Sequence, residues 1–226
     1  MFSIVIPIYN GVKYLEDSLT SVFEQTYKEW EVIIGINGHE PDSEIEKIAN
    51  LIKEKLQNHY KLKNRIDIIY YSTKGKAATL NAMITHCKYN YIALLDVDDI
   101  WLPKKLEKQL AYIDNFDIVG SQCNYFHDMS GSPGIPTGNL KDFNFFSCNP
   151  IINCSAVLKK EFCTWCTDDQ CFGVEDYDLW LRLKHENRTF YNIGEILCLH
   201  RIHRESFFNN SNQNYVDFVK HKWKNI

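Results

Sequence analysis

Residues 91–100 read YIALLDVDDI, an apolar run that ends in a cluster of aspartates. The run from Tyr91 to Leu95 has the continuous hydrophobic pattern of a strand buried on both faces, which is typical of a parallel sheet. Further strands are expected in similar short runs at residues 3–6, 31–36, 66–71 and 117–120.

Segments with helical spacing separate these runs. Apolar residues recur every three or four positions in residues 12–23, 45–56, 77–87 and 106–113. Strands alternating with helices predict an α/β fold with a mostly parallel, doubly wound central sheet flanked by helices. Ligands of such sheets bind beyond the carboxyl ends of the strands. We therefore expect the site near Tyr9, Asn10 and the aspartates that follow residue 95.

The alternation stops near Gly120. Residues 128–149 are rich in Gly, Pro, Ser and Asn, and predict a long loop that either closes over the site or is disordered. The remainder predicts short mixed strands and one clear helix at about residues 175–186. We expect a single domain over residues 1–226, with a nucleotide-binding half to about residue 120 and an acceptor-binding half from about residue 121.

Composition narrows the class of protein. The net charge is −4 and no strong basic patch is visible, so no nucleic-acid partner is expected. No apolar run approaches the ~20 residues of a transmembrane helix, and no export signal is evident at the start. We expect a cytoplasmic protein, with peripheral membrane association and oligomeric state left open, and reduced cysteines. Cys163, Cys166 and Cys171 raise the question of zinc, but the remaining cysteines are scattered and buried thiols are favoured.

Three aspartates directly follow the predicted strand at residues 91–95. Residues two apart on an extended backbone face the same way, so Asp96 and Asp98 can converge on one ligand. Clustered carboxylates raise each other's pKa. A hard divalent cation, Mn²⁺ or Mg²⁺, would remove that cost and bridge a diphosphate. The alternative is that Asp98 or Asp99 caps the helix whose start is indicated by Pro103.

Acidic residues also open the predicted helix at residues 175–186. Glu175 and Asp176 lie in its first turn, where a carboxylate could accept the proton of an attacking hydroxyl. A favourable interaction with the helix dipole is the simpler explanation, and spacing alone favours it.

Two basic segments complete the candidates. Residues 74–76 (KGK) precede a helix and suit a phosphate or a nucleobase carbonyl, although a solvated lysine pair is the default and no P-loop is present. Residues 200–204 (HRIHR) could hold a diphosphate or complete a metal shell, with plain surface exposure as an equal alternative.

Together, and in this order, these segments resemble the large family of inverting glycosyltransferases with the GT-A fold, in particular family 2, over essentially the whole chain. Residues 4–10 (IVIPIYN) resemble that family's first strand and nucleotide-contacting turn, and residues 94–101 (LLDVDDIW) resemble its Asp-x-Asp signature. Residues 174–183 (VEDYDLWLRL) are similar to its Glu-Asp base motif, and residues 201–203 (RIH) to its late Arg-x-His element.

The resemblance implies a role for each matched residue. Asp176 would be the catalytic base, with Glu175 orienting the acceptor or the base. Asp98 would bind the metal, Mn²⁺ or Mg²⁺, on the diphosphate, and His203 is the candidate further ligand. Asp96 would contact the ribose. The residues expected to bind the nucleotide are Pro7, Ile8, Tyr9, Asn10, Asn37, Lys76, Asn81, Asp96 and Val97.

Two positions depart from the family pattern. Many members have an acidic pair before the glycine that ends the second strand, where this chain has Ile36-Asn37-Gly38, and this weakens the expected preference for uracil. Many members also have Arg-Asn where this chain has Leu80-Asn81. The implied activity is metal-dependent, inverting transfer of a sugar from a nucleoside diphosphate donor, with a UDP-sugar expected. The acceptor would be a hydroxyl of a saccharide, glycolipid or other lipid-linked glycan, or glycoprotein. The alternatives are a non-catalytic nucleotide- or sugar-binding module on the same fold, and a nucleotidyltransferase, whose glycine-rich activation loop is not evident.

Overall fold

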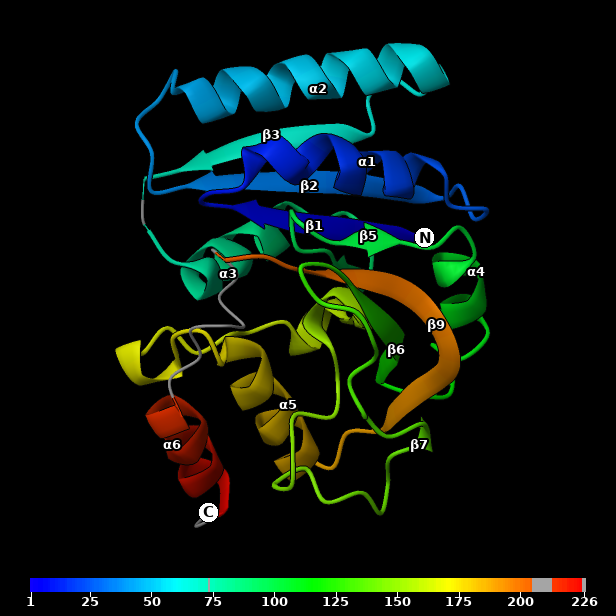
Figure 1. The fold of residues 1–226 in the computed structure, drawn as a ribbon, viewed down its shortest axis with the longest axis vertical. Coiled ribbons are helices and arrows are strands. Elements are labelled where there is room, and N and C mark those ends of the chain that lie inside the picture. The colour runs from blue at the N-terminus through cyan, green and yellow to red at the C-terminus, as the bar shows by residue number, and fades with distance from the viewer. Residues whose placement is uncertain (73, 205–212, 225–226) are drawn as a thin grey trace.

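A computed structural model describes residues 1–72, 74–204 and 213–224. In these ranges the chain forms one sheet of nine strands with helices on both faces (Figure 1). The spatial order is β3-β2-β1-β4-β8-β6-β9-β5, and β7 pairs with β9. The strands are β1 (Phe2–Ile8), β2 (Trp30–Asn37), β3 (Ile66–Tyr71), β4 (Tyr91–Leu94), β5 (Ile100–Trp101), β6 (Ile118–His127), β7 (Gly138–Asn139), β8 (Val157–Lys159) and β9 (Phe190–Ile202).

The first four strands form the predicted parallel sheet. β1 pairs with β2 and with β4, and β2 pairs with β3, all in parallel register. Because β1 lies between two strands and under helices on both faces, its side chains are buried in both directions. Ile4 and Ile6 join one apolar cluster, whereas Val5 joins the other. The continuous apolar run in the sequence is explained by this two-sided burial.

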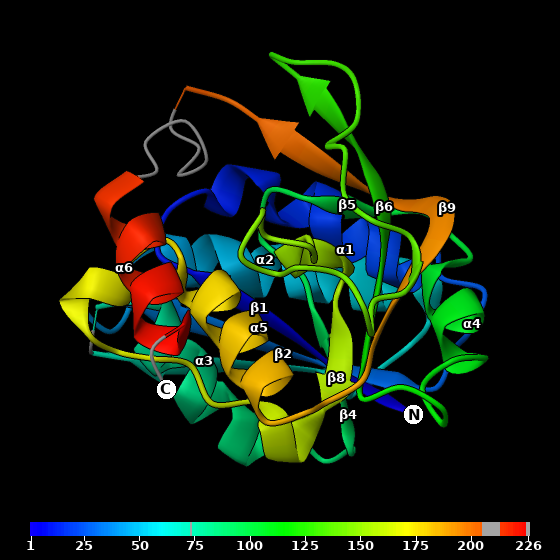
Figure 2. The same ribbon diagram turned by 90° about the horizontal axis from the view of Figure 1, so that it is seen from below.

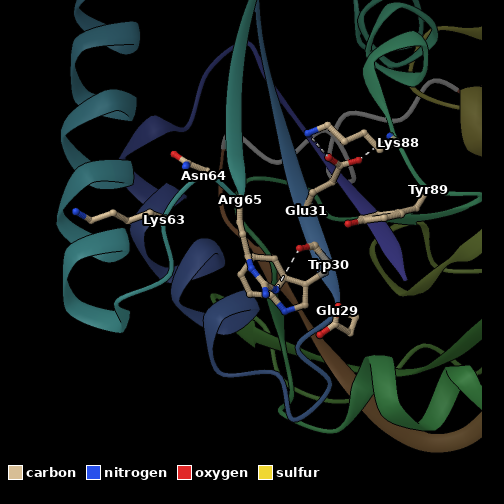
Figure 3. A pocket seen from close by; sticks show the side chains of 8 residues that line it. All are labelled: Glu29, Trp30, Glu31, Lys63, Asn64, Arg65, Lys88 and Tyr89. Atoms are coloured by element: carbon tan, nitrogen blue, oxygen red, sulfur yellow. Dashed lines mark hydrogen bonds and ion pairs between the residues drawn. The ribbon is translucent and has the colours of Figure 1, made fainter.

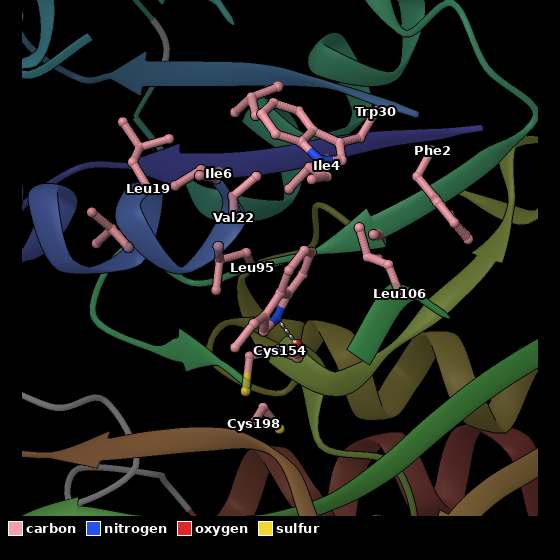
Figure 4. Packing of buried hydrophobic residues seen from close by; sticks show 14 of the residues in the cluster. Phe2, Ile4, Ile6, Leu19, Val22, Trp30, Leu95, Leu106, Cys154 and Cys198 are labelled. Atoms are coloured by element: carbon pink, nitrogen blue, oxygen red, sulfur yellow. Dashed lines mark hydrogen bonds between the residues drawn. The ribbon is translucent and has the colours of Figure 1, made fainter. Parts of the chain in front are cut away.

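Each apolar cluster is covered by its own helices. α1 and α2 lie against the cluster that contains Ile4, Trp30 and Leu95 (Figure 4), and α3, α5 and α6 lie against the other (Figures 1 and 2). The helices are α1 (Leu15–Phe23), α2 (Glu44–Tyr60), α3 (Lys76–His86), α4 (Lys105–Leu110), α5 (Glu175–His185) and α6 (Gln213–Lys224). The α/β fold class predicted from the alternation of strands and helices is confirmed.

The second half departs from the prediction of short strands. β9 is 13 residues long, and β6 continues seven residues beyond the predicted end at Gly120, to His127. β6 and β9 pair in parallel along most of this length, with an irregularity near Gln122. The short strand β8 lies between β4 and β6 and is antiparallel to both. The long pairing gives β9 a path from the far end of the sheet to the aspartates that follow β4.

The loop at residues 128–149 packs against the second half of the fold. Leu140 and Phe145 are buried, and the main-chain oxygen of Phe145 accepts a hydrogen bond from the hydroxyl of Tyr177 at 2.6 Å. Asn192 of β9 donates to the main-chain oxygen of Pro136 at 2.8 Å. The loop is therefore joined to both α5 and β9.

The cysteines are free thiols, and six of the eight are buried. Cys163 and Cys171 are buried, as expected, whereas Cys166 is half-buried, and its sulfur lies 2.8 Å from that of Cys171. Lys222 donates to Asp178 beside this pair. Among the described residues, no helix has the length and apolar character that crossing a bilayer requires.

Candidate active site

The aspartates after β4 form a turn at the carboxyl edge of the parallel strands. The main-chain N–H of Asp99 donates to the oxygen of Asp96 at 3.1 Å, which closes the turn. β5 then pairs antiparallel with β9, with Ile100 opposite Leu199. The turn is thereby attached to the strand that carries the late histidines and arginine. Lys104 occupies the N-cap position of α4, so the alternative that an aspartate caps this helix is wrong.

Asp96 lies between a cation and an amide. Its Oδ1 is 2.5 Å from the ammonium of Lys76, and its Oδ2 accepts from the Asn153 side chain at 2.9 Å. Burial alone would raise the pKa of Asp96, but the Lys76 charge and the two hydrogen bonds outweigh it and lower the pKa. Asp96 is therefore ionised at neutral pH, with its two oxygens oriented by partners from two other segments.

Asp98 contacts His203. The Nε2 atom of His203 lies 3.0 Å from Oδ2 of Asp98, although 105 residues separate them in sequence. Burial and the negative charges of Asp99 and Asp96 raise the pKa of Asp98, and the histidine contact only partly offsets this. A carboxylate destabilised by its neighbours and an imidazole side by side are a donor set that suits a divalent cation.

Asp99 has a structural role behind this pair. It is fully buried and contacts the His200 ring at 3.0 Å and the main-chain N–H of Arg201 at 2.9 Å. Burial would lower the pKa of His200, but the Asp99 charge outweighs it and raises the pKa to about 9, so that the ring is charged at neutral pH. The pair anchors the acidic turn to β9.

Arg201 is 7% exposed, so the surface alternative for this basic segment is wrong at this residue. Its Nε donates to the main-chain oxygen of Asp98 at 2.8 Å, and a second nitrogen donates to Asp17 at 3.0 Å. The guanidinium also lies over the rings of Tyr14 and Phe126. Arg201 therefore fixes the backbone that presents Asp98.

Asp176 lies in the first turn of α5. Its Oδ2 accepts from the Asn149 side chain at 3.1 Å, and its Oδ1 accepts from the N–H of Tyr177 at 2.7 Å. Burial and the charge of Glu175 raise the pKa of Asp176 to about 6, while Lys76 and Asn149 limit the rise. A carboxylate with a pKa near 6 is a stronger base than an ordinary aspartate and is still ionised at neutral pH.

Lys76 connects the two acidic segments. It is the first residue of α3, where a positive charge interacts unfavourably with the positive end of the helix dipole. Burial would lower its pKa, but Asp96, Glu175 and Asp176 outweigh that effect and raise it. Lys76 is therefore charged, and its ammonium compensates carboxylates from both the acidic turn and α5.

Four of the predicted nucleotide contacts lie at the end of β1. Pro7 is half-buried, Ile8 is buried, and Tyr9 and Asn10 are exposed. The Tyr9 ring stacks on His39 with centroids 5.2 Å apart, and the ammonium of Lys74 lies 4.5 Å from its centroid. This exposed aromatic and cationic surface stands beside the acidic turn, where Val97 is 9% exposed and packs near Gly11.

Two other predicted nucleotide contacts are used within the protein. Asn37 is 1% exposed; its amide donates to the oxygen of Ile8 at 2.9 Å and accepts from the N–H of Gly75 at 3.3 Å. Asn81 donates to the main-chain oxygen of Trp165 and accepts from its N–H, both at 2.8 Å. These bonds position both side chains. Each amide retains a second N–H and a second acceptor lone pair, so a direct contact with a nucleotide stays a prediction for both residues.

Asn149 and Asn153 were not predicted from the sequence. They contact the two carboxylates from a single segment between β7 and β8, one at Asp176 and the other at Asp96. The Oδ1 atom of Asn153 is buried, with no hydrogen-bond partner among the described residues. The segment is irregular apart from a short 3-10 helix at Asn153–Ser155, and its sequence has no periodicity or motif from which these contacts could be recognised.

A depression of about 260 Å³ lies at the opposite end of the parallel strands from the acidic turn (Figure 3). Glu29, Trp30, Arg65 and Tyr89 line it at the amino ends of β2, β3 and β4, and Lys88 there pairs with Glu31 at 3.1 Å. None of the candidate active-site residues lines this depression. The residues that could perform chemistry converge instead at the carboxyl ends.

An acidic turn and a carboxylate-bearing helix thus meet at the carboxyl edge of a mostly parallel sheet, where the ligands of such sheets bind. Residues 3–164 match the family described as "Glycosyl transferase family 2". The chain belongs to this family and is a glycosyltransferase.

Characterised and uncharacterised relatives agree with this assignment. The chain is 32% identical over 221 residues to the O-antigen biosynthesis glycosyltransferase WbnJ of Escherichia coli, covering 91% of this chain and 81% of WbnJ. It is 30% identical over 246 residues to the uncharacterized glycosyltransferase MJ1057 of Methanocaldococcus jannaschii, covering all of this chain and 80% of that protein.

Solved structures show the same fold at low sequence identity. S. aureus TarS in complex with UDP-GlcNAc superposes with a TM-score of 0.69 and 15% identity over 93% of this chain. The mannosyltransferase PcManGT from Pyrobaculum calidifontis, in complex with GDP-Man and Mn²⁺, gives a TM-score of 0.69 and 14% identity over 92% of this chain. This chain spans only 61% and 59% of those two structures. The predicted GT-A fold is confirmed.

Proposed function

We propose that this glycosyltransferase is metal-dependent and inverting, and that it moves a sugar from a nucleoside diphosphate donor, expected to be a UDP-sugar, to an acceptor hydroxyl. The main support for this proposal is the position of Lys76. Its ammonium contacts Asp96 and compensates the negative charge of Asp176. The acidic turn of the first half and the candidate base of the second half therefore face one shared site.

A divalent cation fits the residues of the acidic turn. Asp98 and His203 offer an oxygen and a nitrogen 3.0 Å apart, and the raised pKa of Asp98 reflects negative charge that a cation would relieve. We assign these two residues as the ligands of Mn²⁺ or Mg²⁺. When bound, such an ion supplies Lewis-acid stabilisation of the charge on a departing nucleoside diphosphate.

Asp176 has the properties that a general base needs. Its carboxylate is ionised at neutral pH, and burial and Glu175 keep it basic enough to accept the proton of an attacking hydroxyl. Attack from the face opposite the leaving group inverts the anomeric carbon. Glu175, 8% exposed beside it, supports the orientation of the base or the acceptor.

The donor is proposed from the site and from what related structures bind. We propose that a nucleobase stacks on Tyr9, whose ring has Lys74 and His39 around it. We propose a ribose hydroxyl as the ligand of Asp96, which pairs with Lys76 in this structure. TarS was solved with UDP-GlcNAc, and PcManGT with GDP-Man and Mn²⁺. We propose that residues up to about 120 bind the donor, and that later residues bind a saccharide, lipid-linked or protein acceptor.

A screen of nucleotide sugars tests this function. Thermal shift with UDP- and GDP-sugars, each with and without Mn²⁺, identifies the donor, because binding to the folded state raises the melting temperature. Hydrolysis of that donor in the presence of Mn²⁺ then tests for catalysis with water as acceptor. A donor that binds but is never hydrolysed or transferred would support the non-catalytic binding module instead.

A further inference from the structure

Asn149 contacts the candidate base from the loop that precedes β8. We propose that Asn149 is a positioning residue that holds the Asp176 carboxylate in one orientation and favours its ionised form. This inference rests on the proposed function, since it concerns the same site, but it can be tested separately.

The orientation of the Asn149 amide is determined by its second contact. Its Oδ1 accepts from the main-chain N–H of Ile151 at 3.3 Å, so its NH₂ group faces Asp176, with Nδ2 3.1 Å from Oδ2. An NH₂ group can only donate. A carboxylate accepts this hydrogen bond more strongly than a protonated carboxyl group does, so the contact favours the ionised form of Asp176.

The segment that carries Asn149 is anchored on two sides. The next residue, Pro150, is buried, and its oxygen accepts from the Asn192 side chain of β9 at 2.8 Å. Four residues earlier, the oxygen of Phe145 accepts from the Tyr177 hydroxyl of α5 at 2.6 Å. Asn149 is consequently held in place by the sheet and by the helix of the base, as a positioning residue must be.

The groups around Asp176 have distinct effects on its charge. Glu175, in the same helix turn, disfavours ionisation, whereas Lys76 of α3 and the N–H of Tyr177 favour it. Lys76 also pairs with Asp96. Since a bound ribose at Asp96 would compete for that lysine, Asn149 is the side-chain partner whose support of Asp176 does not depend on the donor.

Carbon-13 NMR tests the inference without any assay of activity. The protein is labelled at the side-chain carboxyl carbons of aspartate, and the Asp176 resonance is assigned from its loss in Asp176→Asn. We expect Asn149→Ala to raise the apparent pKa of Asp176 by about one unit. Asn149→Asp should raise it further, because a second carboxylate adds like charge. Asn144→Ala, an exposed residue of the same loop, is the matched control and should leave the pKa unchanged.

The pH profile of donor hydrolysis gives a second readout. For Asn149→Ala we expect kcat at pH 6 to fall several-fold and to recover toward the wild-type value near pH 8, with KM for the donor unchanged. An Asp176 resonance that titrates as in the wild type in both Asn149 variants would overturn the inference, whatever the activity. A wild-type protein that binds and hydrolyses no nucleotide sugar would instead overturn the proposed function.

Discussion

Asp176 must be ionised at neutral pH and yet basic enough to take a proton. An ordinary exposed aspartate meets only the first requirement, since its pKa is near 4. Burial and Glu175 raise the pKa of Asp176, and Lys76 and Asn149 limit the rise, so that the pKa is about 6. The balance depends on residues from α3, α5 and the loop before β8, so it could not be predicted from the Glu-Asp motif alone.

Replacing Asp176 by Asn should reduce donor hydrolysis or transfer by about 100-fold or more, because the amide cannot accept the proton. Donor affinity should remain close to that of the wild type. In the wild type, activity should fall as the pH drops below about 6, since Asp176 is then protonated. Steady-state rates across pH 5–9, with calorimetric donor binding, measure both effects.

Asp178 offers a matched control on the same helix. Its carboxylate is buried and accepts from Lys222 and Trp223 of α6, both at 2.8 Å. Asp178→Asn should lower stability but leave the rate per folded molecule unchanged. Normal turnover in Asp176→Asn would show that another group is the base.

The two proposed metal ligands illustrate what residue patterns can and cannot predict. Asp98 and His203 were each candidates from local motifs, and the structure brings them to 3.0 Å. Arg201 belongs to the Arg-x-His element recognised in the sequence, but its hydrogen bond to the main chain of Asp98 was not predicted. Asn153, which contacts Asp96, belongs to no pattern visible in the sequence. Their roles arise from β9 and β8 meeting the acidic turn, which are contacts between segments more than 50 residues apart.

Elements of the first half could be predicted because local patterns decide them. Parallel strands under helices on both faces produce continuous apolar runs, and amphipathic helices separate them. β8 is only three residues long and β9 contains exposed Ile196, so neither has a clear local signature. Their positions are decided by pairing with β4 and β6, which sequence periodicity does not report.

α3 is joined to the second half by Asn81. Replacing Asn81 by Ala removes both hydrogen bonds to the main chain of Trp165. We expect the free energy of unfolding to fall by about 2 kcal/mol, at roughly 1 kcal/mol for each bond, while the affinity for nucleotide is unchanged. Urea unfolding and calorimetric UDP titration measure the two effects, with Asn90→Ala, at an exposed asparagine, as control. A variant that stays stable but loses UDP affinity would support the direct nucleotide contact predicted from the sequence.

At the scale of the whole molecule, a buried lysine links stability to pH. Lys105 is fully buried, donates to Gln109 at 2.7 Å, and lies 4.0 Å from the centroid of the Trp101 ring. Burial lowers its pKa from 10.5 to about 7, with only a partial offset from Cys198 and Cys154. Between pH 7 and 10.5 the unfolded chain therefore binds more protons than the folded one at this group, and its contribution to stability rises with pH.

Replacing Lys105 by Met should remove this dependence. Relative to the variant, the wild type should gain about 3 kcal/mol of unfolding free energy between pH 7 and pH 10. Urea unfolding at several pH values measures the difference in unfolding free energy between the wild type and the variant. The titration of all other groups is the same in both proteins and cancels in this difference. Lys108→Met, where the side chain is partly exposed and pairs with Glu195, should follow the wild type. Parallel curves for the wild type and Lys105→Met would show that burial does not lower the pKa of Lys105.

The two halves of the fold meet at the acidic turn. The turn after β4 supplies Asp96 and Asp98, His203 directly follows β9, and the segment before β8 supplies Asn153. Our central proposal is that this arrangement binds a divalent cation together with a diphosphate. Cation and nucleotide should then bind cooperatively, since each adds contacts and charge compensation for the other.

Calorimetric titration of UDP into the protein, with Mn²⁺ and then with EDTA, measures this coupling directly. We expect Mn²⁺ to strengthen UDP binding at least about tenfold in the wild type. Asp98→Asn should lose this gain, whereas Asp114→Asn, at an exposed aspartate, should keep it. Equal UDP affinity with and without Mn²⁺ in the wild type, or an undiminished gain in Asp98→Asn, would contradict the proposed site.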